Sequence, residues 1–192
     1  LLGLRPETEA SVREALPEAI GMLVFAETVP GGAAHGLLEP GDILLRVQGN
    51  RIDGFAALEA ILDASVGESV AIRVERGGAL VEVSLTVEDL HSITPASYLE
   101  LGGAILHPLS YQQARNHGVP AGGVYLVSRG YSFGRAGVPS RVVITEVDGE
   151  PVKDLDDFER LLAARADGSR VLIRYFPVSS AWSSAVAAVT LD

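Results

Sequence analysis

The 192-residue sequence has no cysteine, which excludes disulfide bonds, thiolate metal sites and a cysteine nucleophile. It is also poor in basic residues, with 15 Lys and Arg against 25 Asp and Glu and a formal net charge of −10. Binding of nucleic acid needs clustered Lys and Arg, so this balance argues against a nucleic-acid surface. No apolar run reaches the roughly 18 residues of a membrane span, and no signal peptide is recognisable. Because the sequence starts at Leu1, we expect a piece of a longer protein.

Apolar residues and turn formers are plentiful. Apolar residues make up 47% of the chain, and 21 glycines with 10 prolines predict many turns. In the stretch 36–50, Pro40 and Gly41 predict a turn that leads into a short apolar strand at residues 43–47. Gly49-Asn50 predicts a second turn. We therefore expect a small strand held between two tight turns, with a helix packed beside it.

Hydrophobic periodicity predicts the other elements of the first half. We expect a helix over residues 7–16 and a buried strand over residues 21–26. Alternating apolar residues on both sides of Gly77-Gly78 predict a β-hairpin. The residues that form the apolar stripe of an amphipathic helix are Phe55, Leu58, Ile61 and Leu62.

The second half predicts a similar series. Ser110 and Gln113 stand at capping-box spacing, which predicts a short helix over residues 110–116. Residues 130–137 read as a glycine-rich loop. Leu155, Phe158, Leu161 and Leu162 form a second amphipathic stripe, and the remaining expected strands are 123–127, 142–144, 171–175 and 185–189.

The two halves repeat at an offset of about one hundred residues. A repeat of this length is a domain rather than a solenoid unit. We therefore predict a mainly β protein with helices (α+β), made of two small, partly open barrels or sandwiches, each with one main amphipathic helix and one short helix. The predicted bounds are residues 1–87, a connector at 88–98, and 99–192. The matched positions are Val47 with Val147, Gly49 with Gly149, and Leu58 with Phe158.

Two kinds of motif give the repeat a family resemblance. The series from Gly36-Leu37 to Gly41-Asp42-Ile43 resembles the strand-turn motif of PDZ domains of the HtrA type. Residues 89–95 and 109–115 are similar to segments in the tandem PDZ region of the nuclear HtrA-like serine proteases of fungi and of their plant and bacterial relatives. The resemblance covers nearly the whole chain. It implies a trypsin-like protease domain before Leu1, and no catalytic residues within this chain.

A PDZ domain binds an extended peptide as an extra strand on a sheet edge, against a flanking helix. In the first domain the resemblance implies a carboxylate-binding loop at Leu1, Leu2, Gly3 and Leu4, because a glycine-containing loop can aim backbone amides at a carboxylate. The facing wall is expected at Phe55, Leu58, Ile61 and Leu62. The equivalents in the second domain are Gly102, Gly103, Ala104, Ile105, Leu155, Phe158 and Leu162.

An alternative interpretation is that these apolar residues simply fill the cores. The second domain also departs from the pattern: Pro139-Ser140-Arg141 stands where the first has Pro40-Gly41-Asp42, and its carboxylate loop has glycine where an apolar residue is expected. The second domain is therefore expected to be the more degenerate of the two, with a structural role.

Two further patterns concern catalytic and metal sites. Residues 130–134 match the Gly-x-Ser-x-Gly nucleophile motif around Ser132, but such a hydrolase places its His after the Ser, and the last histidine here is His117. The four histidines show no metal-binding spacing. We predict no catalytic residue, no metal and no cofactor. A stand-alone serine hydrolase using Ser132 remains the weakest alternative.

The sequence thus favours a peptide-binding and regulatory module that recognises hydrophobic C-termini or unfolded segments for an attached protease. A second hypothesis is a structural module that docks on its own protease domain or drives homo-oligomerisation. The sequence does not determine the compartment, although a bacterial source would favour the cell envelope.

Overall fold

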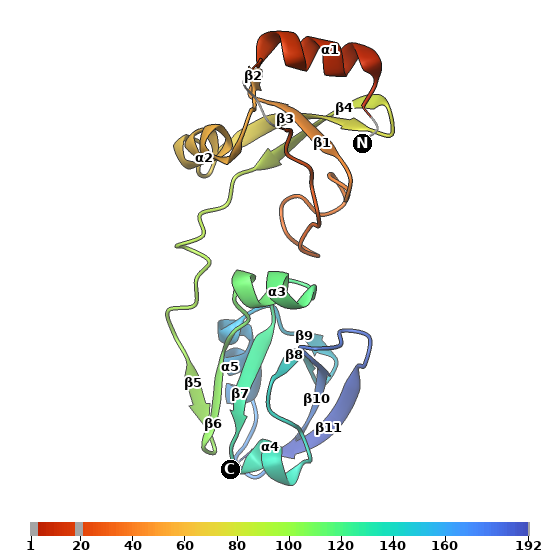
Figure 1. The fold of residues 1–192 in the computed structure, drawn as a ribbon. Coiled ribbons are helices and arrows are strands. Elements are labelled where there is room, and N and C mark those ends of the chain that lie inside the picture. The colour runs from red at the N-terminus through yellow and green to blue at the C-terminus, as the bar shows by residue number, and fades with distance from the viewer. Residues whose placement is uncertain (1–3, 18–20, 192) are drawn as a thin grey trace. The chain divides into compact units, whose positions relative to one another are not determined.

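A computed structural model describes residues 4–17 and 21–191 of the chain. The chain forms two compact units, the first comprising residues 1–28 and 32–89 and the second residues 29–31 and 90–192. Figure 1 labels the elements of each unit. The predicted domain bounds at residues 87 and 99 stay a prediction.

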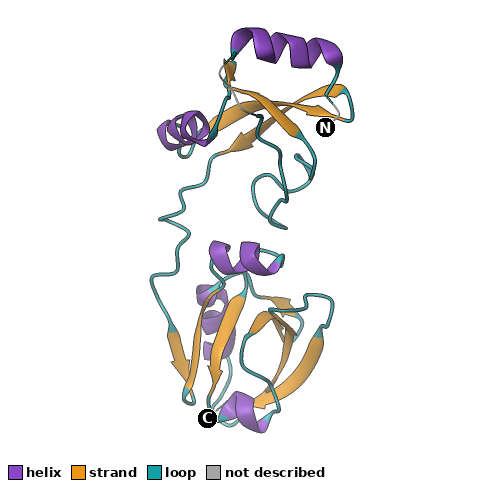
Figure 2. Cartoon of the chain, in the orientation of Figure 1, coloured by secondary structure: helices purple, strands orange, loops and turns teal. Residues whose placement is uncertain are grey.

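The first unit is built on a four-stranded antiparallel sheet, in the order β2-β1-β3-β4 (Figure 2). One face of the sheet, together with α2, encloses a core that contains Leu44, Val47 and Val74, each at most 1% exposed. The predicted N-terminal helix is present as α1. The elements are α1 (Pro6–Ala15), β1 (Ile43–Val47), β2 (Asn50–Arg51), α2 (Phe55–Ala64), β3 (Ser69–Arg76) and β4 (Ala79–Thr86).

The second unit has a longer sheet, in the order β11-β10-β8-β7-β6-β5, with β9 paired to β8. Its main core is larger and includes Leu106, Leu126, Phe133 and Phe158, each at most 1% exposed. The predicted capping box of Ser110 and Gln113 is present at the start of α3. The elements are β5 (Leu99–Leu101), β6 (Ala104–Pro108), α3 (Tyr111–His117), β7 (Val124–Arg129), α4 (Ser132–Arg135), β8 (Val142–Val147), β9 (Glu150–Pro151), α5 (Leu155–Ala163), β10 (Arg170–Pro177) and β11 (Ala185–Thr190).

The fold class is mainly β with helices, as predicted, and the sheets are open over the residues described. The repeat is visible in the geometry. Between β1 and β3 the register shifts between Leu44 and Arg46, and the pair β8–β10 shifts at the equivalent point, between Arg174 and Tyr175. The strands β1 and β8 each end in a turn of two residues with positive φ, which are Gln48-Gly49 in the first unit and Asp148-Gly149 in the second.

Two predicted elements differ from those observed. Residues 21–26 do not form a regular strand: Val24 makes a single bridge to Ile43, although Leu23 and Phe25 exchange backbone hydrogen bonds with the chain around Asp42 and Leu44. Its counterpart in the second unit, β7, is a full strand because β6 pairs with its other edge. The predicted loop at residues 130–137 contains the one-turn helix α4.

The predicted alignment of the two turns before β1 and β8 is wrong by one residue. The Gly41 N–H donates to the Phe25 carbonyl at 2.8 Å, and the Arg141 N–H donates to the Leu126 carbonyl at 2.7 Å. Both residues have positive φ, 95° and 66° respectively. Pro40-Gly41-Asp42 therefore corresponds to Ser140-Arg141-Val142, so Arg141 takes a left-handed conformation that costs a non-glycine residue energy.

Asp42 is the polar centre of this turn in the first unit. Its side chain is fully buried and accepts hydrogen bonds from the Arg76 guanidinium at 2.6 and 2.7 Å and from the Glu39 N–H at 2.9 Å. Arg76 also donates to the Leu37 carbonyl, which ties the whole turn to the end of β3. The hydrogen bonds from Arg76 hold the pKa of Asp42 below its ordinary value.

The second unit replaces this ion pair with apolar residues. Val142 stands at the position of Asp42 and is fully buried, and the β8–β10 register pairs it with Pro177, which stands at the position of Arg76. A buried ion pair and a well-packed apolar pair can stabilise the same position to a similar degree, because the cost of removing the two charges from water offsets much of their attraction. The second unit therefore lacks the Gly-Asp motif but stabilises the same turn with apolar residues.

We predict that Asp42→Asn destabilises the first unit by about 2 kcal/mol, because it weakens charge-assisted hydrogen bonds and removes the buried counter-charge of Arg76, which keeps only its ion pair with Glu39. Hydrogen exchange of the β1 and β3 amides measures this loss. The depressed pKa adds a pH effect: Asp42 contributes stability above about pH 4 and loses that contribution as the pH falls further. The variant should lack this part of the acid sensitivity, and Asp63→Asn, an exposed change on α2, should retain it.

Candidate functional site

The predicted carboxylate loop of the second unit is a tight hairpin turn. Gly102 and Gly103, with φ of 53° and 73°, connect β5 to β6. The two strands pair antiparallel, with Leu99 opposite Leu106 and Leu101 opposite Ala104. On its other edge β6 pairs with β7. The edge of β6 to which an added peptide strand would bind therefore carries the chain's own strand β5.

The other predicted residues of the second unit come together, but inside its core. Ala104 and Phe158 are fully buried, and Leu155 and Leu162 are 6% and 9% exposed in the same cluster. Leu99 and Leu101 of β5 pack against that cluster. Ile105 is 41% exposed on β6. Their arrangement fits the alternative that these residues fill the core, and their assignment to peptide binding stays a prediction.

Gly130 packs directly against the turn of this hairpin. A Cβ built at Gly130 would lie 2.1 Å from the Ala104 nitrogen and 2.3 Å from the Gly103 carbonyl carbon, so only glycine fits. The next residue, Tyr131, donates its N–H to the Gly102 carbonyl at 2.8 Å. The backbone that leads into α4 thus crosses directly over the β5–β6 turn and fixes it against the rest of the unit.

Ser132 follows in the same crossing and is 2% exposed. A Cβ on Gly102 would lie 2.6 Å from its Oγ, and this oxygen has no hydrogen-bond partner among the residues that the structure describes. A catalytic serine needs a base within hydrogen-bond reach and access to substrate. The geometry of Ser132 provides neither, so it gives the serine-hydrolase alternative no support.

In the first unit, three of the predicted binding residues, Leu1, Leu2 and Gly3, lie outside the described residues. Leu4 is half-buried, and α1 begins two residues later at Pro6. The described residues of the first unit therefore contain no counterpart of β6. Sequence reasoning had no signal for this difference, since it depends on which strand pairs with the edge at residues 23–25.

The apolar stripe of α2 is correspondingly more open than that of α5. Phe55 is 68% exposed, and Leu58, Ile61 and Leu62 are half-buried beside the core, whereas the four equivalent residues of α5 are all buried. Beside the stripe, Leu23 and Phe25 pack against the same core. Val24 between them is 40% exposed, and its backbone makes no hydrogen bond to another described residue, because the bridge to Ile43 is formed by the hydrogen bonds of Leu23 and Phe25.

Sites of two other kinds are not found in the described part of the chain. No group of three or more His, Asp or Glu side chains is arranged so that it could hold a metal ion. Over the same residues, every helix is too short or too polar to pass through a lipid bilayer.

Comparison with known proteins identifies the class of domain. Residues 92–167 match the family model of a PDZ-like domain. The match agrees with the antiparallel sheet, the flanking helix α5 and the hairpin of the second unit. It begins within the connector predicted at 88–98.

Over its whole length the chain is similar to HtrA-like serine proteases. It is 45% identical over 192 residues to Protease Do-like 7 of Arabidopsis thaliana, covering 100% of this chain and 18% of that protein. It is 41% identical over 191 residues to the Pro-apoptotic serine protease NMA111 of Ajellomyces capsulatus, covering 100% of this chain and 19% of the relative. The corresponding protease of Aspergillus clavatus is 44% identical over 174 residues, 91% of this chain and 17% of the relative.

The chain is therefore similar to a part of HtrA-like serine proteases, and residues 92–167 within it match the PDZ-like family, as the sequence motifs indicated. It spans less than a fifth of the length of these relatives.

We predict that Gly130→Ala destabilises the second unit by about 3 kcal/mol, because the added methyl group overlaps the backbone of the β5–β6 turn. The measurement is hydrogen exchange of the β6 and β7 amides. Gly134→Ala is the matched control: its Cβ would meet only the Arg129 side chain, at 3.8 Å, so it should change stability little. Equal effects of the two substitutions would show that the close contact of Gly130 with the β5–β6 turn does not set its effect on stability.

Proposed function

We propose that the chain is a peptide-binding and regulatory module of an HtrA-type serine endopeptidase, with the first unit as the working peptide site. The single observation that supports this proposal is the contrast between the two amphipathic helices. In the second unit the apolar stripe of α5 is buried and β6 carries β5 on its edge. In the first unit the stripe of α2 is half open, and no described strand takes the position of β6.

The peptide in this proposal has an extended backbone and apolar side chains. It pairs as an added strand and places its side chains against Phe55, Leu58, Ile61 and Leu62, while backbone amides near Leu1 to Leu4 receive its terminal carboxylate. A hydrophobic C-terminus or an unfolded segment satisfies both requirements. The partners are therefore exposed peptide ends and the attached protease domain, to which the module delivers substrate.

The second unit has a structural role in this proposal. A peptide could pair with β6 only by displacing β5, whose Leu99 and Leu101 pack against the core. That displacement would expose apolar surface and break the strand pairing. We therefore expect the second unit to bind peptide much more weakly than the first.

The test uses the 192-residue chain and an eight-residue peptide that ends in Val with a free carboxylate. We expect titration calorimetry to detect binding that is lost when the peptide's C-terminus is amidated. Phe55→Ala and Leu58→Ala should each weaken binding about tenfold, because each removes apolar contact area from the site. Phe55 is the more informative variant, since its exposure makes an effect on folding small.

Ala60→Gln is the control, because Ala60 is exposed on the same helix and away from the apolar stripe. It should bind like the unmodified chain. If no peptide binds and the chain instead forms concentration-dependent oligomers, the structural alternative replaces this proposal. If binding survives both Phe55→Ala and Leu58→Ala, the peptide site does not lie at α2.

A further inference from the structure

Charged residues form a row across the sheet of the first unit. The strand registers place Arg51 opposite Arg46, Arg46 opposite Arg73, and Arg73 opposite Glu82. The row thus crosses β2, β1, β3 and β4 with three arginines and one glutamate. Like charges directly opposite each other on neighbouring strands are destabilising. The arginines thus destabilise the sheet locally in a chain whose overall net charge is −10, which points to a role for them other than stability.

Within the described residues, one arginine of the row has a counter-charge. Arg73 donates to the Glu82 carboxylate at 2.6 and 2.9 Å. Arg46 donates to the Gly49 carbonyl at 2.6 Å, and Arg51 donates to the hydroxyl and the carbonyl of Ser11. Among the described residues, Glu82 is the one carboxylate that is bonded to the row. Over the part of the chain that the structure describes, Arg46 and Arg51 therefore have no ion-pair partner.

The second unit has an acidic residue at the strand position that Arg46 takes in the first unit. Glu146 stands at the position of Arg46, and Arg174 stands at the position of Arg73. There the two side chains form an ion pair, with the Arg174 Nε 2.6 Å from the Glu146 carboxylate. The fold therefore accepts a carboxylate beside this arginine. Arg46 is not needed to build the strand, so its presence calls for another reason.

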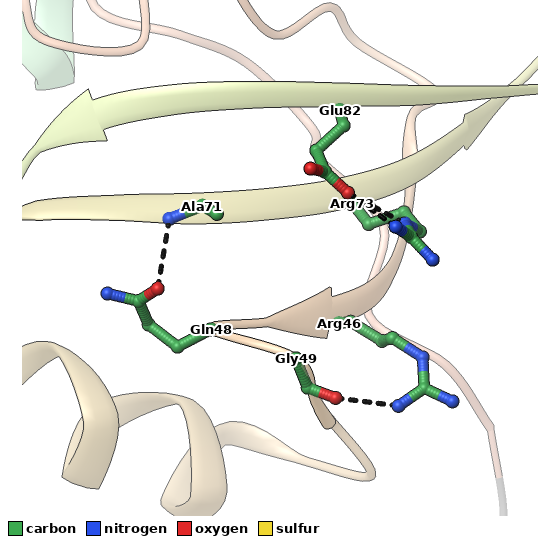
Figure 3. Close-up of a pocket in the computed structure, with 6 residues that line it drawn as sticks. All are labelled: Arg46, Gln48, Gly49, Ala71, Arg73 and Glu82. Atoms are coloured by element: carbon green, nitrogen blue, oxygen red, sulfur yellow. Dashed lines mark hydrogen bonds and ion pairs between the residues drawn. The ribbon is translucent and has the colours of Figure 1, made fainter.

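The space beside the two arginines is open. A shallow hollow of about 400 Å³ is lined by the residues drawn in Figure 3, and the Arg46 and Arg73 side chains extend toward it from neighbouring strands. Gln48 closes one side through an interaction with the Ala71 N–H at 3.5 Å. Guanidinium groups present forked donors that match the two oxygens of a carboxylate. The lining residues are Arg46, Gln48, Gly49, Ala71, Arg73 and Glu82.

We propose that this hollow binds an acidic peptide segment of a partner protein. One carboxylate of the segment takes, between Arg46 and Arg73, the place that Glu146 takes beside Arg174 in the second unit. The occupant is a carboxylate because the two carboxylates that the chain places beside these strand positions, Glu82 and Glu146, both bond to the equivalent arginine. The site is separate from α2 and does not depend on the peptide site proposed there.

The experiment uses the 192-residue chain and an eight-residue peptide of alternating Glu and Gly, acetylated and amidated so that it has no free C-terminus. Fluorescence anisotropy at low ionic strength measures its affinity. Arg46→Glu should weaken binding at least about tenfold, since it replaces a charged donor with a repelling carboxylate. Arg46→Gln should weaken it less. Because Arg46→Glu recreates the pair found in the second unit, its melting temperature should equal or exceed that of the unmodified chain.

Arg170→Glu is the matched control, since it makes the same change in net charge at an exposed position of β10. Its affinity should stay within about twofold of the unmodified chain. The proposal is overturned if Arg46→Glu binds the peptide unchanged, or if Arg170→Glu weakens binding as much. Inorganic phosphate that displaces the peptide at equal concentration would assign the hollow to phosphate and would also overturn it. Binding of the Val-terminated peptide to the same variants reports separately on the site at α2.

Discussion

The structure of each unit depends on one bulged antiparallel strand pair, β1 with β3 and β8 with β10. The bulge falls at the same point in both pairs and bends the strand before it enters a turn whose two residues have positive φ. That turn reverses the chain and sets the direction from which α2 or α5 reaches the sheet. The core of each unit depends on this geometry.

The two units hold the same frame with different chemistry. The first uses charge, in the buried pair of Asp42 and Arg76, and it also carries the arginine row across its sheet. The second uses apolar packing at Val142 and Pro177 and a neutral ion pair at Glu146. Charged groups are costly to bury or to crowd, whereas apolar pairs are not. The copy that keeps the costly groups is also the copy with the more open helix face, which fits a division between a binding unit and a supporting unit.

Much of this could be predicted from residue patterns. The stripe of Phe55, Leu58 and Ile61 predicts α2, the alternation on either side of Gly77-Gly78 predicts β3 and β4, and Ser110 with Gln113 predicts the start of α3. These features are local, because the spacing of a few neighbouring residues is enough to identify each element. Residues 21–26 could not be resolved in this way, because a short apolar run becomes a regular strand only if a neighbouring strand pairs with it.

The sequence by itself determined the repeat, the mainly β class and the PDZ-like motifs, since periodicity, turn residues and spacing are written in the order of residues. The tertiary structure decided which apolar residues are core and which are open. Phe55 and Leu155 occupy equivalent helix positions, yet one is 68% exposed and the other is buried. It also revealed the close crossing at Gly130 and the row from Arg51 to Glu82. These features depend on strand register between distant segments, which a linear pattern does not contain.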